Sequence, residues 1–596
     1  MPGNAKGRDA LTLELLKARY FRKDEKSWED LCERVARAIA ENEAEYKKFK
    51  ELMVRKAFVP STPTIMNAGT DLGQLSACFV VPVGDSVEEI FEALKVAALI
   101  QKTGGGTGFN FSKIRPRGSS VRATDGVASG PVAFIRLFNV ATDVIKQLGK
   151  RRGANMGILE IDHDDIIPFI RAKSVEGEFS NFNFSVLVPD SFMEAVEAGR
   201  TGEIRNRRTG AKVGELFSEI VEGIWKNGEP GILFRDRINR DNSTPLLGEI
   251  MATNPCGEEP LLDNESCNLA SLNLSAFVKK GVEGEGNGNG KEERNGKEGG
   301  NGKENRKERG KREGNEKEKE NVEVDLEVLR DAARAGIRFL DNEIDKNHYP
   351  TPKIKKATLR TRKVGLGVMG FHDLLLKLKI PYASEKALEL AEELMKNINE
   401  AAILESRALA AEKGPFPEYE RSVWKFPMRN ATLTAIAPTG TISLLAGCSS
   451  GIEPVFNWVY RRSKTFGKEF LIIHPLFEAH FRKKLSSEDY SGLVKHVYEN
   501  GTLQDLKISG FVNEEEKELF RSALDLGWKA HIDMQAAFQR HCHAGISKTI
   551  NMPNEATKED IGQALLYAWN RGLKGLTIYR TGTRQKVVLN LKGKNL

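Results

Sequence analysis

Three side chains that can do chemistry lie close together in the segment NPCGE. Asn254, Cys256 and Glu258 are separated by single residues, and we expect an extended backbone here, in which all three point to the same side. A thiol then lies beside a carboxylate that can move a proton and an amide that can hold a substrate hydroxyl. The carboxylate raises the pKa of the thiol above its usual value of about 8.5, which suits a thiol that reacts in its neutral or radical form.

Two further cysteines are candidates for redox chemistry. Cys267 lies in ESCNLASLNLS, and its spacing from Cys256 does not suit a zinc site, where paired ligands are about two to four residues apart. Cys78 lies in LSACFVVPV. Two cysteines from different strands that meet at a site can cycle between dithiol and disulfide. The alternative is three unrelated buried cysteines, which composition alone favours. We predict no metal site.

The elements that must position these residues are those of a globular α/β protein. The chain has 596 residues, 40% of them hydrophobic, and a net charge of +7. No apolar run is as long as a membrane-spanning helix, and the N-terminus lacks a secretory signal. We therefore expect a cytoplasmic protein with reduced thiols and no membrane partner. Basic and acidic residues are mixed along the chain, so we expect no nucleic-acid partner.

The amino-acid composition and the hydrophobic pattern change along the chain. Residues 1–57 have the apolar spacing of amphipathic helices and predict a small N-terminal helical region. Residues 58–278 and 322–596 alternate short apolar runs with helical stretches, which is typical of one α/β catalytic domain. Residues 279–321 contain almost only Gly, Asn, Lys, Arg and Glu. They predict a charged, disordered surface loop that interrupts this domain.

Three glycine-rich stretches resemble nucleotide-binding loops. GLGVMG, residues 365–370, fits the dinucleotide pattern, but a basic segment precedes it where an apolar strand is required, so we reject that reading. GGGTGFN, which begins at Gly104, is interpreted as a close backbone approach or a plain turn. In APTGTIS, a β-rich run meets a turn and a helix-compatible segment, so Thr439, Gly440, Thr441 and Ser443 can hold a phosphate. Ordinary threonine capping explains the same spacing equally well.

Taken together, the motifs resemble those of the catalytic subunit of ribonucleotide reductases, in particular the adenosylcobalamin-dependent (class II) branch. The resemblance implies a ten-stranded α/β barrel with a central finger loop, preceded by the helical region. The similar segments run in family order from Phe58 to Arg584 and are FVPSTPTIMNAG, LSACFVVPVGDS, GGGTGFNFSKIRPRG, GKRRGANMG, NPCGE, SCNLASLNLS, RKVGLGVMGF, APTGTIS and GLTIYRTGTR.

The resemblance also implies roles for the five residues considered first. Cys256 becomes the thiyl radical that removes the ribose 3′ hydrogen, Glu258 is the base on the 3′ hydroxyl, and Asn254 binds the ribose hydroxyls. Cys78 and Cys267 deliver two electrons to the 2′ carbon and end as a disulfide. The implied activity is that of a ribonucleoside-diphosphate reductase; a triphosphate substrate stays open.

Further residues are implied to bind nucleotides. The implied allosteric site takes a deoxynucleoside triphosphate (dNTP) effector at the interface of a homodimer, and a loop from Lys146 to Gly153 relays its identity. The residues implied to bind substrate are Ser61, Thr62, Gly105, Gly106, Pro438, Thr439, Gly440, Thr441 and Ser443. Those implied to bind the effector are Asp85, Ser86, Arg115, Lys146 and Gln147.

The radical source and the reductant are the points on which the sequence leaves alternatives. Tyr579 follows Ile578 without a second tyrosine, which argues against a radical relay from a partner subunit and for adenosylcobalamin. The alternative is a class I-type large subunit that needs a separate metal-containing subunit; a second is a non-catalytic nucleotide-binding regulator. No cysteine follows Cys542, so the C-terminal pair usual in the family is not seen. Either that pair lies outside this sequence, or a thioredoxin- or glutaredoxin-like protein reduces Cys78 and Cys267 directly.

Overall fold

A ten-stranded sheet forms the centre of the computed structural model, which describes residues 5–121, 125–145, 153–280, 322–465, 468–506, 512–583, 589–591 and 594–595. β11 is its branch point, because it pairs with β1, β2 and β14. The strands of this sheet are β1 (Phe58–Pro60), β2 (Cys78–Val80), β3 (Gly106–Asn110), β6 (Asn155–Glu160), β7 (Phe182–Val188), β8 (Gly231–Phe234), β11 (Ser266–Asn273), β14 (Val364–Met369), β17 (Thr549–Met552) and β18 (Gly575–Arg580).

The sheet closes into a barrel made of two halves. In one half β2, β3, β6, β7 and β8 are parallel. In the other, β11 is parallel to β14 and β17 is parallel to β18. Residues 432–436 join β14 to the segment before β17 through the parallel bridges Leu366–Thr434 and Ile436–Ile546. The halves meet where β11 and β18 run antiparallel to β2 and β8. The prediction of a ten-stranded α/β barrel is confirmed.

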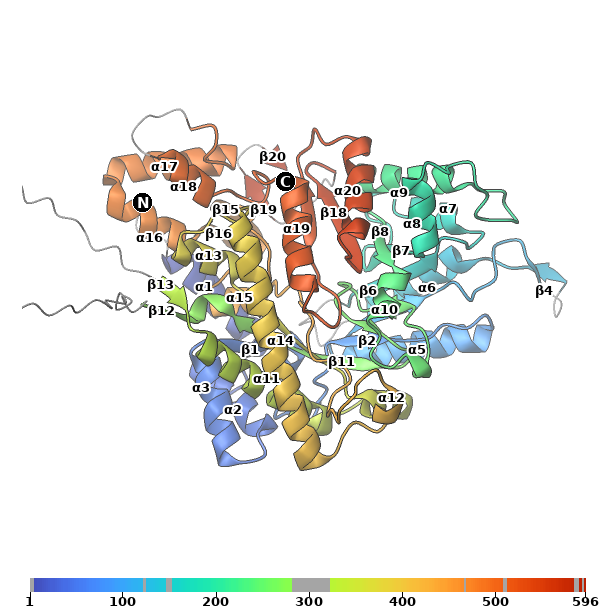
Figure 1. Cartoon of the computed structure of the whole chain (residues 1–596), viewed down its shortest axis with the longest axis horizontal. Helices are drawn as coiled ribbons and strands as arrows, with labels where there is room; N and C mark the ends of the chain where they lie inside the picture. Colours follow the sequence, from blue (N-terminus) through green and yellow to red (C-terminus); the bar gives the residue numbers. More distant parts are fainter. Residues whose placement is uncertain are drawn as a thin grey trace, which may run out of the picture.

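Helices cover the outside of both halves (Figure 1). α5 packs on β3 and α7 on β6, whereas α11 packs on β11 and β14. α14 lies across α11 and α19. The sequence marks several of these helices through capping; Ser86 and Glu89, for example, form a capping box at the start of α5. The helices are α5 (Val87–Lys102), α6 (Pro131–Val144), α7 (Ile166–Arg171), α8 (Asp190–Glu197), α9 (Val213–Asn227), α10 (Arg235–Arg240), α11 (Leu326–Lys346), α12 (Pro352–Thr361), α13 (Phe371–Leu378), α14 (Glu385–Lys413), α19 (Trp528–Gln539) and α20 (Lys558–Asn570).

The N-terminal region is helical, as predicted. It contains α1 (Ala5–Leu15), a π-helix (Leu16–Tyr20), α2 (Trp28–Ile39) and α3 (Glu43–Val54), and α4 (Thr62–Asn67) follows β1. Ser27 and Asp30 form a capping box at the start of α2. The apolar face of α2, which includes Cys32, is buried, and α2 and α3 pack against α11. The N-terminal helices therefore extend the core of the second half of the barrel.

A β-hairpin occupies the centre of the barrel. Its strands β9 (Ala252–Thr253) and β10 (Pro260–Leu261) pair antiparallel. On one side, Asn183 of β7 donates a hydrogen bond to the Pro255 carbonyl at 2.8 Å. On the other, the Gly545 amide donates to the Glu258 carbonyl at 2.8 Å. Because these partners belong to opposite halves of the barrel, the hairpin must lie between them. This hairpin is the predicted finger loop.

Glycines line the barrel where the hairpin and its neighbours come close. A Cβ on Gly108 of β3 would lie 1.7 Å from the Thr253 carbonyl oxygen, and one on Gly367 of β14 would lie 2.2 Å from the Ala435 carbonyl oxygen. Contacts this short leave room only for glycine at both positions. GTGFN and GLGVM are therefore barrel strands, and their glycines admit protein backbone rather than a dinucleotide.

A smaller unit is inserted between β14 and β17 of the second half of the barrel and takes its last two strands from residues after β18; the sequence did not predict it. Trp458, Phe477, Phe481 and Phe520 form part of its apolar core. Its sheet has the order β16 (Lys468–Ile473), β15 (Val459–Thr465), β19 (Leu589–Leu591) and β20 (Lys594–Asn595). Its helices are α16 (Pro475–Lys484), α17 (Ser487–Asn500) and α18 (Glu514–Leu519).

The ends of the predicted charged loop lie next to each other. β12 (Val278–Lys280) pairs antiparallel with β13 (Val322–Val324), so residues 279 and 280 belong to a strand, and residues 281–321 lie outside the described residues. Within the described part of the chain, no helix is long and apolar enough to cross a membrane. The remaining elements are β4 (Ser120–Val121), β5 (Gly126–Val127) and α15 (Ile442–Ala446).

Candidate active site

The tip of the finger hairpin is a turn, not the extended segment that we expected. The Gly257 amide donates a hydrogen bond to the Asn254 carbonyl at 3.1 Å, which closes a four-residue turn. Gly257 has a φ of +81°, a conformation that glycine adopts without strain. Asn254, Cys256 and Glu258 still line one cavity, but they do so because the hairpin turns back on itself and not because side chains alternate along a strand.

Asn254 connects the finger hairpin to β2. Its side-chain amide donates to the Cys78 sulfur at 3.0 Å, and its side-chain oxygen accepts from the Glu259 amide at 3.0 Å. Both ends of the side chain are thus held by neighbours, and its orientation is set by the fold. A fixed amide beside a cavity is suited to orienting a polar ligand.

Cys78 and Cys267 face each other across the seam between the two halves of the barrel. They are register partners in the antiparallel pair of β2 and β11, where opposite Cβ atoms are about 4.5–5.5 Å apart. A small adjustment brings such a pair to the separation of a disulfide. Both side chains are buried and the cysteines are in the thiol form. Burial raises the pKa of the Cys267 thiol well above its usual value, and the charge of Glu259 raises it further.

The smaller of two cavities at the site, with a volume of about 210 Å³, brings most of the predicted residues together. Cys267 does not line it, although its register partner Cys78 does. Ser443 does not line it either; it lines the larger cavity, and its hydroxyl oxygen lies 2.9 Å from that of Ser450. The predicted residues that line the smaller cavity are Ser61, Thr62, Cys78, Gly105, Gly106, Asn254, Cys256, Glu258, Pro438, Thr439, Gly440 and Thr441.

One wall of the smaller cavity is built from the starts of two short helices, α4 and α15. Ser61 and Thr441 are their N-cap residues, and the first amides of a helix have no intrahelical acceptor. Thr439 has a φ of +52°, and its hydroxyl accepts a hydrogen bond from the Gly451 amide at 2.7 Å. A residue that has a β-carbon is strained in this left-handed conformation. The hydrogen bond from Gly451 therefore helps to hold the turn before α15 in place.

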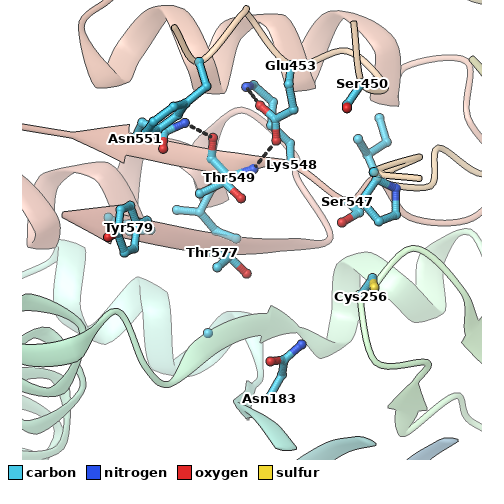
Figure 2. Close-up of a pocket in the computed structure, with 18 of the residues that line it drawn as sticks. Asn183, Cys256, Ser450, Glu453, Ser547, Lys548, Thr549, Asn551, Thr577 and Tyr579 are labelled. Atoms are coloured by element: carbon cyan, nitrogen blue, oxygen red, sulfur yellow. Dashed lines mark hydrogen bonds and ion pairs between the residues drawn. The ribbon is translucent and has the colours of Figure 1, made fainter. Parts of the chain in front are cut away.

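A larger cavity, of about 750 Å³, lies on the other side of Cys256. Figure 2 shows Cys256 and Asn183 on one side of this cavity, with Thr549, Thr577 and Tyr579 across from them. Cys256 lines both cavities and is exposed, whereas the other five cysteines are buried. Its sulfur is therefore accessible to two different ligands.

Most residues of the larger cavity were missed by the sequence analysis. They come from β7, β17, β18 and the smaller unit, and no short motif links them. An ion pair in its wall joins Lys548 to Glu453 at 2.6 Å (Figure 2). Lys548 also contacts His531 at 3.1 Å. Burial lowers the pKa of Lys548, although Glu453 opposes this effect. Only the alternation of polar and apolar residues in SKTINM hinted at a strand with one face on a cavity.

The predicted effector residues lie away from both cavities, at the start of α5. The Arg115 guanidinium and backbone amide both donate to the Asp85 carboxylate, at 2.7 Å each. Ser86 is the N-cap residue of α5. The structure therefore brings Asp85, Ser86 and Arg115 together. Lys146 and Gln147, and most of the predicted relay loop, lie outside the described residues.

Comparison with known proteins assigns the chain to a family. A model described as "Ribonucleotide reductase, barrel domain" matches residues 76–428 and 421–579, and one described as "Ribonucleotide reductase, all-alpha domain" matches residues 6–73. The chain belongs to the ribonucleotide reductase family.

Similar proteins agree with this assignment. A "Vitamin B12-dependent ribonucleoside-diphosphate reductase" of Thermoplasma acidophilum is 46% identical over 91% of this chain and 66% of its own length. One of Mycobacterium tuberculosis with the same name is 39% identical over 98% of this chain and 81% of its own length. This chain thus spans about two thirds of the first relative. The class Id ribonucleotide reductase alpha subunit of Actinobacillus ureae has the same fold, with a TM-score of 0.74 over 96% of both chains at 23% identity.

Proposed function

We propose that this chain is an adenosylcobalamin-dependent ribonucleoside-diphosphate reductase, which converts ribonucleotides to 2′-deoxyribonucleotides. The observation that carries the proposal is the position of Cys256 at the tip of the finger hairpin, between two cavities. One cavity contains the groups that ribose reduction needs, and the other has room for a cofactor. The names of the relatives from Thermoplasma and Mycobacterium support the cofactor and the diphosphate substrate.

The substrate lies in the smaller cavity with its phosphates toward α4 and α15. Backbone amides and hydroxyls at helix starts bind phosphate oxygens, and Ser61, Thr62, Gly440 and Thr441 line this end. The ribose then lies toward the finger hairpin, beside the three cavity-lining polar residues of its tip. Gly106 leaves room for the hairpin tip in this cavity, because a Cβ there would lie 2.8 Å from the Pro255 ring.

The finger hairpin activates the ribose. Cys256, as a thiyl radical, takes the 3′ hydrogen atom, Glu258 takes the 3′ hydroxyl proton, and Asn254 holds the ribose hydroxyls by hydrogen bonds. The 2′ hydroxyl then takes a proton from one thiol of the Cys78–Cys267 pair and leaves as water, and Glu258 returns its proton to the 3′ oxygen. Cys78 and Cys267 supply the two electrons and the hydrogen that replace it, and their sulfurs join as a disulfide. Cys256 finally returns a hydrogen atom to the 3′ carbon.

The larger cavity is the proposed cofactor site. Its volume of about 750 Å³ is far larger than that of the substrate cavity. Its wall carries neutral hydroxyl and amide groups, which match the amide and hydroxyl groups of adenosylcobalamin. When bound, the cofactor supplies the radical chemistry that protein side chains lack. The side chains proposed to hold it are Asn183, Ser547, Thr549, Asn551 and Thr577.

Regulation and assembly involve α5 and α6, on the side of the barrel away from the N-terminal helices (Figure 1). α5 and α6 pack together and expose apolar side chains, among them Phe91, Leu99, Val140 and Val144. An exposed apolar face of this kind marks an interaction surface. We propose that it forms a homodimer and that a dNTP effector binds beside it, at Asp85, Ser86 and Arg115. The loop that begins with Lys146 and Gln147 would pass the identity of the effector to the substrate.

The reductant is proposed to be a thioredoxin- or glutaredoxin-like dithiol protein, or a dithiol segment that such a protein reduces. Cys78 lines the substrate cavity, whereas Cys267 does not. A reductant that enters the empty substrate cavity therefore meets Cys78 first.

The test is release of tritium from 3′-labelled nucleotide under anaerobic conditions. We expect release with the wild-type chain, adenosylcobalamin and a chemical dithiol, and none with Cys256→Ala, which has no sulfur to carry the radical. Cys267→Ser is the matched control, because it keeps the radical step and removes only the electron donor. Tritium release that does not depend on cobalamin but requires an added metal-containing subunit would overturn the cofactor assignment. No release under either condition would overturn the reductase itself.

A further inference from the structure

Glu259 is a buried carboxyl group that the reaction described above does not use. It follows Glu258 at the base of the hairpin tip and is 1% exposed. Neither of its carboxyl oxygens makes a conventional N–H or O–H hydrogen bond within the described residues. Its backbone is fixed, because its amide donates to the Asn254 side chain and its carbonyl accepts from the Asn254 amide at 3.2 Å.

The Glu259 carboxyl lies beside the Cys267 thiol. The Cys267 thiol donates a weak hydrogen bond to the Asn268 carbonyl at 3.6 Å, and Glu259 and Cys267 each change the pKa of the other. Leu269, two residues after Cys267 on β11, lies with the Glu259 carboxyl against Gly365 of β14. A Cβ on Gly365 of β14 would lie 2.2 Å from a Glu259 carboxyl oxygen, so β14 leaves a glycine-sized space for this side chain. The carboxyl is therefore enclosed between β11 and β14, and the Cys267 thiol is its polar neighbour there.

Burial holds a proton on Glu259. It raises the pKa of the carboxyl to about 8, while the Cys267 thiol lowers it, the charge of Glu258 raises it and the charge of Lys363 lowers it. Lys363 is itself paired with Glu265 at 2.7 Å. Cys542 also lies in the field of Glu259. These are the titratable groups that face the carboxyl from the elements around it, and their balance leaves it largely protonated at neutral pH.

The two cysteines of the Cys78–Cys267 pair have different roles when their disulfide is reduced, and the Cys267 sulfur needs a proton. Cys78 is reached from the cavity, so an incoming thiolate attacks its sulfur and Cys267 is the leaving group. A disulfide sulfur leaves more slowly as its thiol pKa rises, and burial raises the pKa of Cys267 well above its usual value. Without a proton donor, the step would leave a thiolate in a buried, apolar place.

We propose that Glu259 is the proton donor to Cys267 when a dithiol reduces the Cys78–Cys267 disulfide. The inference rests on the proposed function for its redox pair, and it concerns the step that restores the enzyme between turnovers.

The atoms and electrons of the step balance. A thiolate of the external dithiol bonds to the Cys78 sulfur, the Cys78–Cys267 bond breaks, and its electron pair goes to Cys267. The Glu259 proton moves to Cys267, which becomes a thiol, and Glu259 becomes a carboxylate that regains a proton from water. The second thiolate of the dithiol attacks the mixed disulfide and releases Cys78, which takes a proton from solvent. The external dithiol ends as a disulfide, oxidised by two electrons.

The experiment follows reduction of the preformed disulfide in the full chain, without nucleotide or cofactor. The disulfide is formed with diamide and reduced with dithiothreitol across neutral and alkaline pH. Alkylation and mass spectrometry count the free thiols of Cys78 and Cys267. We expect the wild-type rate, divided by the thiolate concentration of the reductant, to fall as pH rises through about 8. We expect Glu259→Gln to be slower at neutral pH by about a hundredfold, the usual contribution of a general acid, and to show no such fall.

Glu343→Gln is the matched control, because Glu343 is another fully buried glutamate without a conventional hydrogen bond in the described residues, and its described neighbour is Thr64. It should keep the wild-type profile. A Glu259→Gln profile equal to that of wild type would overturn the proposal. If that variant does not fold, a flat corrected profile in wild type would overturn it equally. Failure of the reductase assignment would appear separately, as absent tritium release with normal disulfide kinetics.

Discussion

Burying a carboxyl group lowers the stability of the folded protein at neutral pH. Glu343 is an example that lies away from the active site. It lies in α11 and is 0% exposed. Burial raises the pKa of its carboxyl well above the usual value, and the Thr64 hydroxyl opposes this only in part. The side chain is therefore neutral in the folded protein and ionised in the unfolded chain at neutral pH, so unfolding releases a proton.

We predict that Glu343→Gln stabilises the protein increasingly as pH rises. The folded pKa is above the unfolded one, so the folded state loses its advantage from about pH 4.5 upward. The loss is about 1.4 kcal/mol per pH unit until the folded pKa is reached. The glutamine variant does not have this loss. The Tm difference between variant and wild type, measured by circular dichroism, should be larger at pH 8 than at pH 5. A difference that is constant between these pH values would contradict the prediction.

The sequence predicted many of the residues that line the smaller cavity. It did not predict the backbone conformation that brings them together. Asn254, Cys256 and Glu258 do line one cavity, but Pro255 and Gly257 turn the chain between them, and a period-two pattern cannot show such a turn. Cys267 is the register partner of Cys78 but is not among the residues that line this cavity. Glu259 carried no sequence signal, because its burial depends on strands that are distant in the chain.

At the scale of elements, the finger hairpin depends on the glycines of the strands around it. We predict that Gly108→Ala greatly reduces activity, because the added Cβ would lie 1.7 Å from the Thr253 carbonyl oxygen and the hairpin would have to move. A displacement of about 1 Å at a reacting group can cost about a hundredfold in rate. Overpacking should also lower the free energy of unfolding by about 1–3 kcal/mol. Tritium release and thermal unfolding measure the two effects.

The control for this prediction is Gly492→Ala in α17, where a Cβ would meet nothing within 4 Å. This variant should keep full activity. Equal activity in the Gly108 and Gly492 variants would show that the hairpin does not need the space beside β3.

Helices were easier to predict from sequence than the barrel strands. Two of the helical stretches that the sequence showed in the α/β domain are α5 and α11, and both begin after capping residues. β3, β11 and β14 lack the usual apolar pattern, because glycines and small or polar residues face the hairpin. Their strand character depends on partners that are far away in the sequence. The family resemblance, and not periodicity, predicted them.

At the scale of the whole molecule, the exposed apolar face of α5 and α6 predicts the oligomeric state. Phe91 on α5 is 50% exposed. We predict that Phe91→Glu converts the proposed dimer to a monomer, because a dimer interface would have to bury the new charge without a partner. Light scattering after size-exclusion chromatography gives the mass directly.

Leu404→Glu on α14 is the matched control, since Leu404 is 49% exposed and α14 lies apart from α5 and α6 (Figure 1). It should leave the mass unchanged. A Phe91→Glu variant with the mass of the wild-type protein would contradict the proposed interface, whatever that mass is.

The paired strands β12 and β13 allow the segment between them to vary without changing the structure of the barrel. Val278 and Val324 are register partners, so the polypeptide leaves the domain and returns at one point. The entropy of closing a flexible connection grows only slowly with its length. This point is therefore suited to engineering: a short turn, an affinity tag or an entire reporter domain inserted there should leave the proposed chemistry at the finger hairpin unchanged.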